Sequence, residues 1–377
     1  MKIVFTGGGT GGHFYPIIAV AQKVNQIIDK EHIIGSKLYY FSDNPYDKEM
    51  LSQNGILYEE INSGKMRTYF SLKNFSDVIK VFFGTINAIY KMFSVYPDVV
   101  FGKGGYASFP TIFAARVLRI PVLIHESDSA PGRVNKWAGR FAKKVAVSFP
   151  EAEEFFPKKT IAWTGQPIMA EIEHPAAKKE ALEYFKIEES NVPVIFILGG
   201  SQGAEIINNV ILDALPRLTK NYIVIHQTGI KNFKSVSGQA EVVLTDAKQL
   251  QRYIPISYLN PLQMKMAAGA ATIIISRAGS TLFEIASWGV PSILVPFTNS
   301  NADHARKNAF SYARAGACVV IEEANMTANI LCSEIERILE DKAGYAQMAQ
   351  NAKTFGKPGA AEKIARELIN IALSHES

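Results

Sequence analysis

The sequence predicts an α/β protein made of two doubly wound domains that face one cleft. Short β-branched runs alternate with helical patterns along most of the chain, which is typical of parallel sheets with helices on both faces. Two of these runs, Lys2 to Thr6 and Val194 to Leu198, each lead into a glycine-rich turn at the start of a helix, Gly7 to Gly12 and Gly199 to Gly203. A chain of 377 residues is also longer than one typical core, and we expect two domains.

The composition excludes several classes of protein. With 47% hydrophobic and 20% charged residues, the chain is globular. The N-terminus lacks the apolar length of a secretory signal, and no apolar run approaches the roughly 18 residues that span a bilayer, so we expect a cytoplasmic protein. The two cysteines, Cys318 and Cys332, lie in separate patterned elements without a CxxC motif, which favours core positions over a disulfide or a zinc site.

The first half of the chain supplies one sheet, because each of its strand candidates is a short apolar run bounded by polar residues, glycine or proline. The expected strands are Lys2 to Thr6, Lys37 to Phe41, Leu57 to Ile61, Asp98 to Phe101, Pro121 to His125 and Val145 to Val147. The helical patterns between them begin near His13, Lys48, Leu72, Phe109 and Arg133.

The alternation fails between Val147 and Val194, where prolines punctuate a charged stretch, and we expect the linker there. The second set of strands is Val194 to Leu198, Ile223 to His226, Val242 to Leu244, Thr272 to Ser276, Ser292 to Val295 and Cys318 to Ile321. We therefore expect a first domain over residues 1–160 and a second over 161–357, with a C-terminal helix, 358–377, packing back on the first domain.

Ligands of doubly wound sheets bind outside the carboxyl ends of the strands, where the strand order reverses. Polar and glycine-rich segments follow the expected strands at those positions. They are Gly7 to His13, Gly102 to Ser108, His125 to Asp128, Gly199 to Gly203, Arg277 to Glu284 and Asn299 to His304.

The first half carries candidate acid and base groups. His13 lies in the first turn of a helix, where the helix dipole disfavours its charged form, so a neutral ring can act as a general base. His125, Glu126 and Asp128 end an apolar strand, and one of them can activate a hydroxyl or orient the group that does. The alternative is that Asp128 or Ser129 merely caps the next helix.

The second half carries a candidate nucleotide site. Ser201 and the neighbouring glycine N–H groups suit a diphosphate, and Glu284, one turn into a helix, suits the two hydroxyls of a ribose. No Asp-x-Asp sequence occurs, so a diphosphate bridged by a metal ion has no obvious protein ligands. Backbone N–H groups and helix ends would then have to stabilise the negative charge of a leaving group. We expect no metal and no cofactor.

Two cofactor classes are disfavoured by spacing. The first glycine turn matches G-x-G-x-x-G, but the acidic residue that would bind a ribose, Asp43, follows about 30 positions later instead of roughly 20. Gly102-Lys103-Gly104 lacks the hydroxyl residue and the glycine spacing of a P-loop.

The net charge is only +5, but lysines and arginines between Lys65 and Lys91 are interleaved with aromatic and aliphatic residues up to Phe93. This pattern suits a protein that sits on an anionic membrane surface. Helical spacing assigns Val78, Phe82, Ile86 and Ile89 to the core, which leaves Phe70, Phe75 and Phe83 for the membrane. No nucleic-acid-binding motif accompanies the charge, so we expect no nucleic-acid partner.

The chain resembles the MurG family over essentially its full length, through motifs that occur in the family's order and spacing. They are Gly8-Gly9-Thr10-Gly11-Gly12-His13, Gly104-Gly105-Tyr106-Ala107-Ser108, His125-Glu126, Asn135-Lys136, Gly199-Gly200-Ser201-Gln202-Gly203-Ala204 and Arg277-Ala278-Gly279-Ser280. The family consists of peripheral membrane N-acetylglucosaminyltransferases of peptidoglycan synthesis.

The resemblance implies the two-Rossmann-domain GT-B architecture and a place on the cytoplasmic face of the cell membrane. It implies UDP-N-acetylglucosamine (UDP-GlcNAc) as donor and the undecaprenyl-linked lipid acceptor called lipid I, undecaprenyl-diphosphoryl-MurNAc-pentapeptide. Transfer to the C4 hydroxyl of the muramoyl sugar, with inversion and without a metal, would give lipid II.

The resemblance also implies roles for individual residues. The acceptor side comprises Thr10, Gly11, Gly12, Tyr106, Asp128 and Asn135. The donor side comprises Ser201, Gln202, Arg277, Ser280, Thr281, Leu282, Glu284 and His304. His13 is the expected catalytic base, with Glu126 as its rival or partner.

This chain departs from the family pattern at four places. Asp128 stands where members often have an asparagine after the His-Glu pair. Met169 stands where many members have an arginine near the donor diphosphate, and Arg277 or Lys103 is a candidate substitute. The segment between Arg277 and Glu284 is one residue shorter than usual. His304 and Ala305 replace a glutamine pair that reads sugar hydroxyls, so Asp303, His304 and Asn299 are candidates for that task.

Two other functions remain open on the sequence. One is an isomerase of the same architecture, such as a UDP-N-acetylglucosamine 2-epimerase, which would convert the donor without an acceptor. The other is a catalytically weak lipid-binding or scaffold protein, which the missing arginine and the altered glutamine pair keep open.

Overall fold

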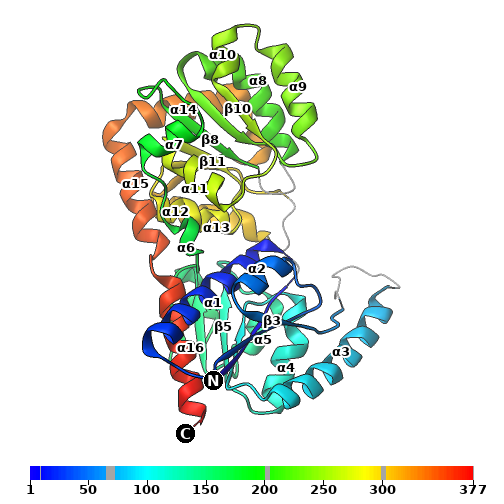
Figure 1. Ribbon diagram of the computed structural model, residues 1–377. Helices are drawn as coiled ribbons and strands as arrows, with labels where there is room; N and C mark the ends of the chain where they lie inside the picture. Colours follow the sequence, from blue (N-terminus) through cyan, green and yellow to red (C-terminus); the bar gives the residue numbers. More distant parts are fainter. Residues whose placement is uncertain (9, 65–72, 200–203, 299–302, 377) are drawn as a thin grey trace. The chain divides into compact units, whose positions relative to one another are not determined.

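The computed structural model describes residues 1–8, 10–64, 73–199, 204–298 and 303–376. The chain forms two compact units (Figure 1). The first unit contains Met1–Ala170 and Gly359–Ser377, and the second contains Glu171–Pro358. Each unit has one parallel sheet with helices packed on it, so the predicted fold class, two doubly wound α/β domains, is confirmed.

The first unit has a seven-stranded sheet in the order β3-β2-β1-β4-β5-β6-β7. The strands are β1 (Lys2–Thr6), β2 (Lys37–Ser42), β3 (Ile56–Glu60), β4 (Val99–Gly102), β5 (Val122–Glu126), β6 (Lys144–Val147) and β7 (Ile161–Trp163). The main helices of this unit are α1 (Gly11–Glu31), α2 (Lys48–Gln53), α3 (Lys73–Val95), α4 (Phe109–Val117), α5 (Arg133–Ala138) and α16 (Ala360–Glu376). The sequence did not predict β7, which lies in the proline-rich stretch and pairs with β6 at the sheet edge.

The second unit has a six-stranded sheet in the order β10-β9-β8-β11-β12-β13. The strands are β8 (Val194–Leu198), β9 (Ile223–Gln227), β10 (Tyr253–Ile256), β11 (Ile273–Ser276), β12 (Ser292–Leu294) and β13 (Cys318–Val320). The helices are α6 (Ala170–Glu173), α7 (Lys178–Tyr184), α8 (Glu205–Asn221), α9 (Phe233–Val243), α10 (Ala247–Gln251), α11 (Pro261–Ala270), α12 (Thr281–Trp288), α13 (His304–Arg314), α14 (Ala328–Glu340) and α15 (Lys342–Gly356).

The prediction of a strand at Val242 to Leu244 is wrong, because these residues end helix α9. The helix buries Val236 and Ala240, four residues apart, while Val242 is 78% exposed. The third strand of this sheet is instead β10, which contains Pro255. Since β10 is an edge strand, the missing N–H of a proline is tolerated there.

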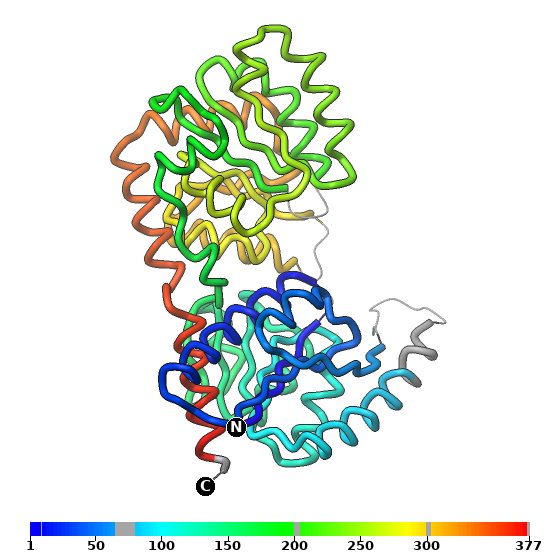
Figure 2. Tube along the Cα trace, viewed as in Figure 1, coloured from blue at the N-terminus to red at the C-terminus, as the bar shows by residue number. Residues whose placement is uncertain are grey.

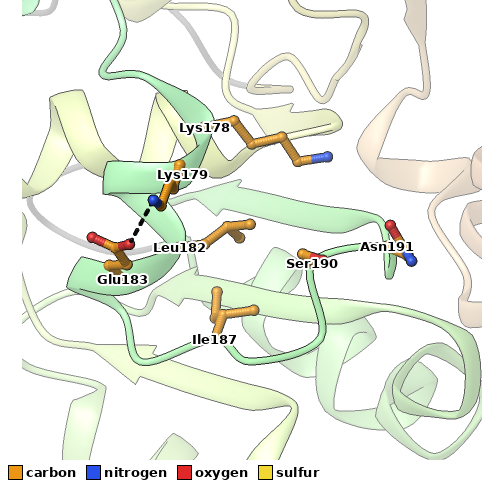
Figure 3. A pocket seen from close by; sticks show the side chains of 7 residues that line it. All are labelled: Lys178, Lys179, Leu182, Glu183, Ile187, Ser190 and Asn191. Atoms are coloured by element: carbon orange, nitrogen blue, oxygen red, sulfur yellow. Dashed lines mark ion pairs between the residues drawn. The ribbon is translucent and has the colours of Figure 1, made fainter.

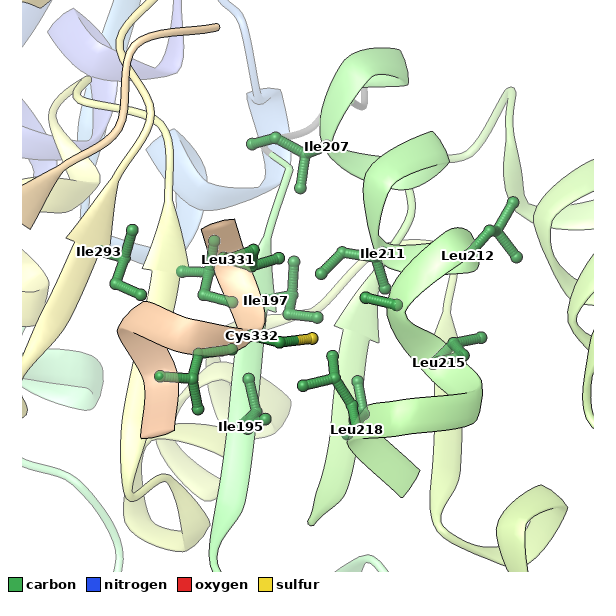
Figure 4. Packing of buried hydrophobic residues seen from close by; sticks show 14 of the residues in the cluster. Ile195, Ile197, Ile207, Ile211, Leu212, Leu215, Leu218, Ile293, Leu331 and Cys332 are labelled. Carbon is green, nitrogen blue, oxygen red and sulfur yellow. The ribbon is translucent and has the colours of Figure 1, made fainter. Parts of the chain in front are cut away.

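The core of the second unit fills the space between its sheet, α8 and α14 (Figure 4). Ile195 and Ile197 of β8 face aliphatic side chains of α8 such as Ile211, and Leu331 and Cys332 of α14 join the same cluster. Cys332 and Cys318 are both buried and free, as predicted. Strand β8 is buried along its whole length, which explains its continuous apolar sequence.

Helix α3 presents an aromatic face to solvent, and two core assignments on it are wrong. Phe82 is 61% and Ile86 50% exposed, whereas the predicted exposure of Phe83 is confirmed. The buried face consists of Gly84, Ala88 and Met92, spaced at four residues. A Cβ on Gly84 would lie 1.7 Å from the Asn62 carbonyl oxygen, so α3 lies directly against that backbone. Phe70 lies outside the described residues, as do the side chains of Phe75 and Val78.

Among the described residues, no helix has both the length and the apolar character needed to cross a bilayer.

Candidate active site

The strand order of the first unit reverses between β1 and β4, which are adjacent in the sheet. Thr6 and Gly102 are paired in register at the carboxyl ends of these two strands. The loop before α1 and the loop before Tyr106 therefore leave the sheet side by side. Strand β5 is the next neighbour, and it ends at Glu126. The structure thus brings the predicted acceptor-side and catalytic residues to one edge of the sheet.

His13 is in the first turn of α1, as predicted, and its ring contacts two neighbours. Thr10 Oγ1 lies 3.1 Å from His13 Nδ1, and the ring also hydrogen-bonds to the Gly8 backbone. Burial lowers the pKa of His13 to about 4, and the Lys103 ammonium adds to this effect. His13 is therefore neutral near pH 7, and burial is the main cause.

Lys103 follows β4 directly and is 1% exposed. Its backbone N–H donates to the Thr6 carbonyl at 2.8 Å, which continues the pairing of β4 with β1. The ammonium donates to Ser127 Oγ. Burial lowers the pKa of Lys103 to about 8, while the carboxylates of Glu126 and Asp128 act in the opposite direction.

Glu126 is buried and organises the loop that follows β5. Its Oε1 accepts the Asp128 N–H, and its Oε2 accepts the Gly132 N–H and Asn135 Nδ2, each at 3.0 Å. Asn135 Nδ2 also donates to the His125 carbonyl at 3.0 Å. Burial and the nearby Asp128 raise the pKa of Glu126. With three donors on one carboxylate, the geometry suits a group that positions the loop.

His125 is separated from this cluster because its ring points into the core. It is completely buried, and Nε2 lies 3.0 Å from the Gly165 carbonyl oxygen. Burial lowers its pKa well below the usual value of a histidine.

Helix α5 begins after Gly132, which is its N-cap residue. The alternative that Asp128 or Ser129 caps this helix is therefore wrong.

Tyr106 is tied to Asp43, a residue that the sequence analysis considered only as a ribose ligand. Burial raises the pKa of Tyr106 to about 12, and the carboxylate of Asp43, its hydrogen-bond partner, adds to this effect. Asp43 Oδ2 also accepts Ser63 Oγ at 2.7 Å. Asp43 thus connects the loops that follow β2, β3 and β4.

The second unit has the same topology, with the strand order reversing between β8 and β11. Leu198 and Ser276 are paired at the carboxyl ends of these strands. The predicted donor residues Ser201 and Gln202 lie outside the described residues. The helix that follows them, α8, is anchored through Asn208, whose Nδ2 donates to the Thr228 carbonyl at 3.0 Å and whose Oδ1 lies 3.1 Å from His226 Nε2.

Helix α12 carries three of the predicted donor residues, and Ser280 is its N-cap residue. Thr281 and Glu284 are half-buried, whereas Leu282 is completely buried, so its side chain belongs to the core. Burial raises the pKa of Glu284 to about 7. Glu284 thus changes its charge near neutral pH.

Arg277 is buried in an ion pair, a setting that the sequence did not reveal. Its Nη1 lies 2.5 Å from Glu323 Oε1 and donates to the Val295 carbonyl at 3.2 Å. The guanidinium also lies 4.3 Å from the centre of the Phe297 ring. Glu323 in turn accepts the Thr298 N–H at 2.9 Å, so Arg277 braces the segment after β12.

The remaining predicted positions lie at the edge of the described residues or inside the core. His304 is the first residue of α13, and its buried Nδ1 has no hydrogen-bond partner among the described residues. Asn299 lies outside them. Met169 is buried and carries no charge, so it does not supply the positive charge of the arginine that many family members have at this position.

A surface pocket of about 410 Å³ occurs in the second unit beside α7 (Figure 3). Lys178, Leu182 and Ile187 are among its lining residues, and Lys179 pairs with Glu183 at its rim at 4.0 Å. None of the predicted site residues lines it. In the described part of the chain, no group of three His, Cys, Asp or Glu side chains could hold a metal ion.

Comparison with known proteins supports the two-domain reading. Residues 3–147 match the glycosyltransferase family 28 N-terminal domain, and residues 194–364 match the glycosyltransferase family 28 C-terminal domain. A UDP-N-acetylglucosamine--N-acetylmuramyl-(pentapeptide) pyrophosphoryl-undecaprenol N-acetylglucosamine transferase of Pediococcus pentosaceus is 34% identical over 97% of this chain and 98% of its own length. The enzyme of the same name from Listeria monocytogenes is 32% identical over 98% of this chain and 99% of its own.

Solved structures agree with this assignment. Acinetobacter baumannii MurG superposes with a TM-score of 0.74 at 25% identity, covering 98% of this chain and 99% of that one. A putative UDP-N-acetylglucosamine 2-epimerase from Listeria monocytogenes has a TM-score of 0.69 at 15% identity over 96% of this chain and 94% of its own, a likeness of fold alone.

Proposed function

The chain belongs to glycosyltransferase family 28 and, within it, to the MurG family, and from this premise we propose that it converts lipid I into lipid II in peptidoglycan synthesis. It transfers N-acetylglucosamine from UDP-GlcNAc to the C4 hydroxyl of the muramoyl sugar of undecaprenyl-diphosphoryl-MurNAc-pentapeptide. The observation that carries the proposal is that the equivalent sheet edges of the two units carry different groups. One has the neutral imidazole of His13, and the other has the half-buried carboxyl group of Glu284.

The second unit is the donor side. The carboxylate of Glu284 accepts the two ribose hydroxyls of UDP-GlcNAc, and Ser280 and Thr281, which start α12, lie close to the diphosphate. Ser201 and Gln202 contribute from the second glycine turn. Arg277 acts indirectly, because its charge is already paired with Glu323 and it braces the loop that precedes His304.

The first unit is the acceptor side and holds the base. The acceptor diphosphate binds at Thr10, Gly11 and Gly12, where the start of α1 provides backbone N–H groups and the positive end of a helix dipole. Tyr106, Asp128 and Asn135 shape the adjoining wall. Glu126 positions Asp128 and Asn135 through its hydrogen bonds.

The reaction is a single in-line displacement. The acceptor C4 oxygen attacks the anomeric carbon from the face opposite UDP, the bond from that carbon to the UDP oxygen breaks, and UDP leaves with the electron pair, so the configuration inverts. The attacking hydroxyl replaces Thr10 Oγ1 as the hydrogen-bond partner of His13 Nδ1, and this nitrogen accepts the hydroxyl proton. N–H groups and helix ends in the donor unit stabilise the departing diphosphate without a metal.

The enzyme works at the cytoplasmic face of the cell membrane as a peripheral protein. The support is the exposed aromatic face of α3, which comprises Phe82, Phe83, Ile86, Tyr90 and Phe93. The exposed Lys80 lies one turn before this face on the same helix. Exposed aromatic residues beside cations suit insertion at an anionic lipid surface.

Transfer from radiolabelled UDP-GlcNAc to a soluble lipid I analogue tests the proposal. We expect a β-linked product by NMR and equal rates with and without EDTA. His13→Ala should abolish most turnover, whereas His174→Ala, at an exposed position of the second unit, should not. The absence of any transfer would contradict the proposed function. A loss of activity in EDTA would contradict the metal-free mechanism. Epimerisation of the donor without an acceptor would favour the isomerase instead.

A further inference from the structure

Lys103 is a buried lysine that has no role in the proposed transfer reaction. The residue is only 1% exposed, so its ammonium is buried. Among the described residues, Ser127 Oγ is the one hydrogen-bond partner of the ammonium. A buried lysine of this kind is costly to the fold, and a cost of that size calls for a physical explanation.

The backbone holds Lys103 next to the His13 ring. The Lys103 N–H is fixed to the Thr6 carbonyl at 2.8 Å, and the His13 N–H to the Thr10 carbonyl at 3.1 Å. A Cβ on Gly7 would lie 3.1 Å from Lys103 Cβ and 3.7 Å from His13 Cβ. The Cβ atoms of Lys103 and His13 therefore both lie close to Gly7, where there is no side chain to separate them.

Carboxylates on the next strand keep the lysine charged. Glu126 and Asp128 both favour the protonated form of Lys103 against the effect of burial. Glu126 is itself held by three N–H donors, so its charge has a fixed position. Of the ionisable groups that face His13, Lys103 after β4 disfavours its protonation and Asp128 after β5 favours it.

We propose that Lys103 is a positioning residue whose positive charge adds to the effect of burial in keeping the His13 ring neutral, so that Nδ1 retains the lone pair that accepts a proton. Protonation of His13 would place two positive charges together in a buried site, where their repulsion is weakly screened. The catalytic part of this inference rests on the proposed role of His13 as the base, whereas the electrostatic part does not.

NMR titration of the His13 ring in the ligand-free full chain tests the electrostatic part. We expect Lys103→Met to move the titration midpoint upward by about one pH unit. Lys103→Gln, which keeps a polar group beside Ser127, should move it in the same direction, and Lys103→Arg should restore it. Asp128→Asn should move it downward. Lys144→Met is the control, because this lysine of the same unit pairs with Glu367 at 3.3 Å on the surface.

The pH profile of kcat/KM for transfer tests the catalytic part. The acid limb should rise with the NMR midpoint in Lys103→Met and return in Lys103→Arg, which a merely structural role would not produce. Unchanged midpoints in folded Lys103→Met and Lys103→Gln would overturn the inference. A midpoint that rises while the acid limb stays in place would support the electrostatic role of Lys103 and contradict His13 as the base.

Discussion

Burial has opposite consequences for His13 and Glu284, although both lie at the point where a strand order reverses. It lowers the pKa of His13 to about 4, which keeps a base in its reactive, neutral form at pH 7. It raises the pKa of Glu284 to about 7, which leaves that carboxyl group only partly ionised at the same pH. The same physical effect therefore prepares one residue for proton transfer and makes the other sensitive to pH.

Donor binding should depend on pH through Glu284. Only the carboxylate accepts both ribose hydroxyls, and its fraction falls as the pH drops through about 7. We expect the affinity for UDP-GlcNAc, measured by calorimetry, to fall about tenfold from pH 8 to pH 6. Glu284→Gln should bind more weakly and without this dependence, whereas the exposed Glu180→Gln should keep it. A flat wild-type profile would count against Glu284 as the ribose acceptor.

Gly105 should tolerate no side chain, because its backbone and its surroundings both exclude one. Its φ of 80° and ψ of 163° lie in a region that belongs almost only to glycine. A Cβ there would lie 3.2 Å from the Gly8 carbonyl oxygen and 3.5 Å from His13 Cε1. We expect Gly105→Ala to cost about 1–3 kcal/mol of stability and to lower kcat, on the order of 10²-fold, by moving the ring.

Urea unfolding and transfer kinetics measure these two effects. Gly238→Ala is the control, since the glycine lies within helix α9 with nothing within 4 Å of the added Cβ. It should stabilise the second unit slightly and leave kcat unchanged. A Gly105→Ala enzyme with wild-type kcat would show that His13 does not depend on this contact.

The sequence predicts secondary structure well where the apolar pattern fits only one arrangement. It predicts poorly where the same pattern fits two, such as a strand or a helix. Buried strands such as β8 are continuous aliphatic runs, and they were located within a residue. Val242 and Val243 have high strand propensity, but the spacing of Val236 and Ala240 decides for a helix. In α3, two of the three buried residues, Gly84 and Ala88, are small, so an amphipathic pattern based on large side chains predicts the wrong face.

Site residues follow the same division. The meeting of His13, Glu126 and Asn135 at one edge of the sheet could be predicted, because they lie in segments at or after the carboxyl ends of strands. The partners of the buried charges could not be predicted, because Lys103 with Ser127 and Arg277 with Glu323 are contacts between residues distant in sequence. Only the strand order brings the ends of β4 and β5 together.

The exposed face of α3 should bind anionic lipid. Removing the aromatic rings of Phe82 and Phe93 takes two large apolar side chains from this face. We expect Phe82→Ser with Phe93→Ser to reduce co-sedimentation with phosphatidylglycerol vesicles at least about tenfold. Turnover of a soluble acceptor analogue should stay within about twofold, since surface changes away from the site have small effects.

Ile34→Ser is the matched control for α3, because Ile34 is 93% exposed and lies between α1 and β2 in the same unit. It should leave vesicle binding unchanged. Equal loss in both variants would mean that binding follows total surface hydrophobicity, and wild-type binding in the double variant would rule out this face as the membrane contact.

The C-terminal segment, Gly359–Ser377, belongs to the first unit. The stability of that unit therefore depends on residues far apart in sequence. Helix α16 packs against α1 and reaches β1 and β4 (Figure 2). Its inner face is aliphatic and buried, and comprises Ile364, Ala365, Leu368, Ile369 and Ala372. The sheet edge that holds His13 and Lys103 is formed by β1 and β4, so α16 supports the core beneath the proposed base.

A core truncation in α16 should therefore act on one unit only. Leu368 is completely buried, and Leu368→Ala should destabilise the first unit by about 2–5 kcal/mol. Leu373→Ala, on the same helix but 42% exposed, should cost less than about 0.5 kcal/mol. Hydrogen exchange should show lost protection in β1, β4 and α1 of the Leu368 variant, with protection in β8 and β11 retained. Affinity for UDP-GlcNAc should persist in this variant, because the proposed donor site lies in the second unit. A parallel loss of exchange protection in both units would show that the whole chain unfolds as one.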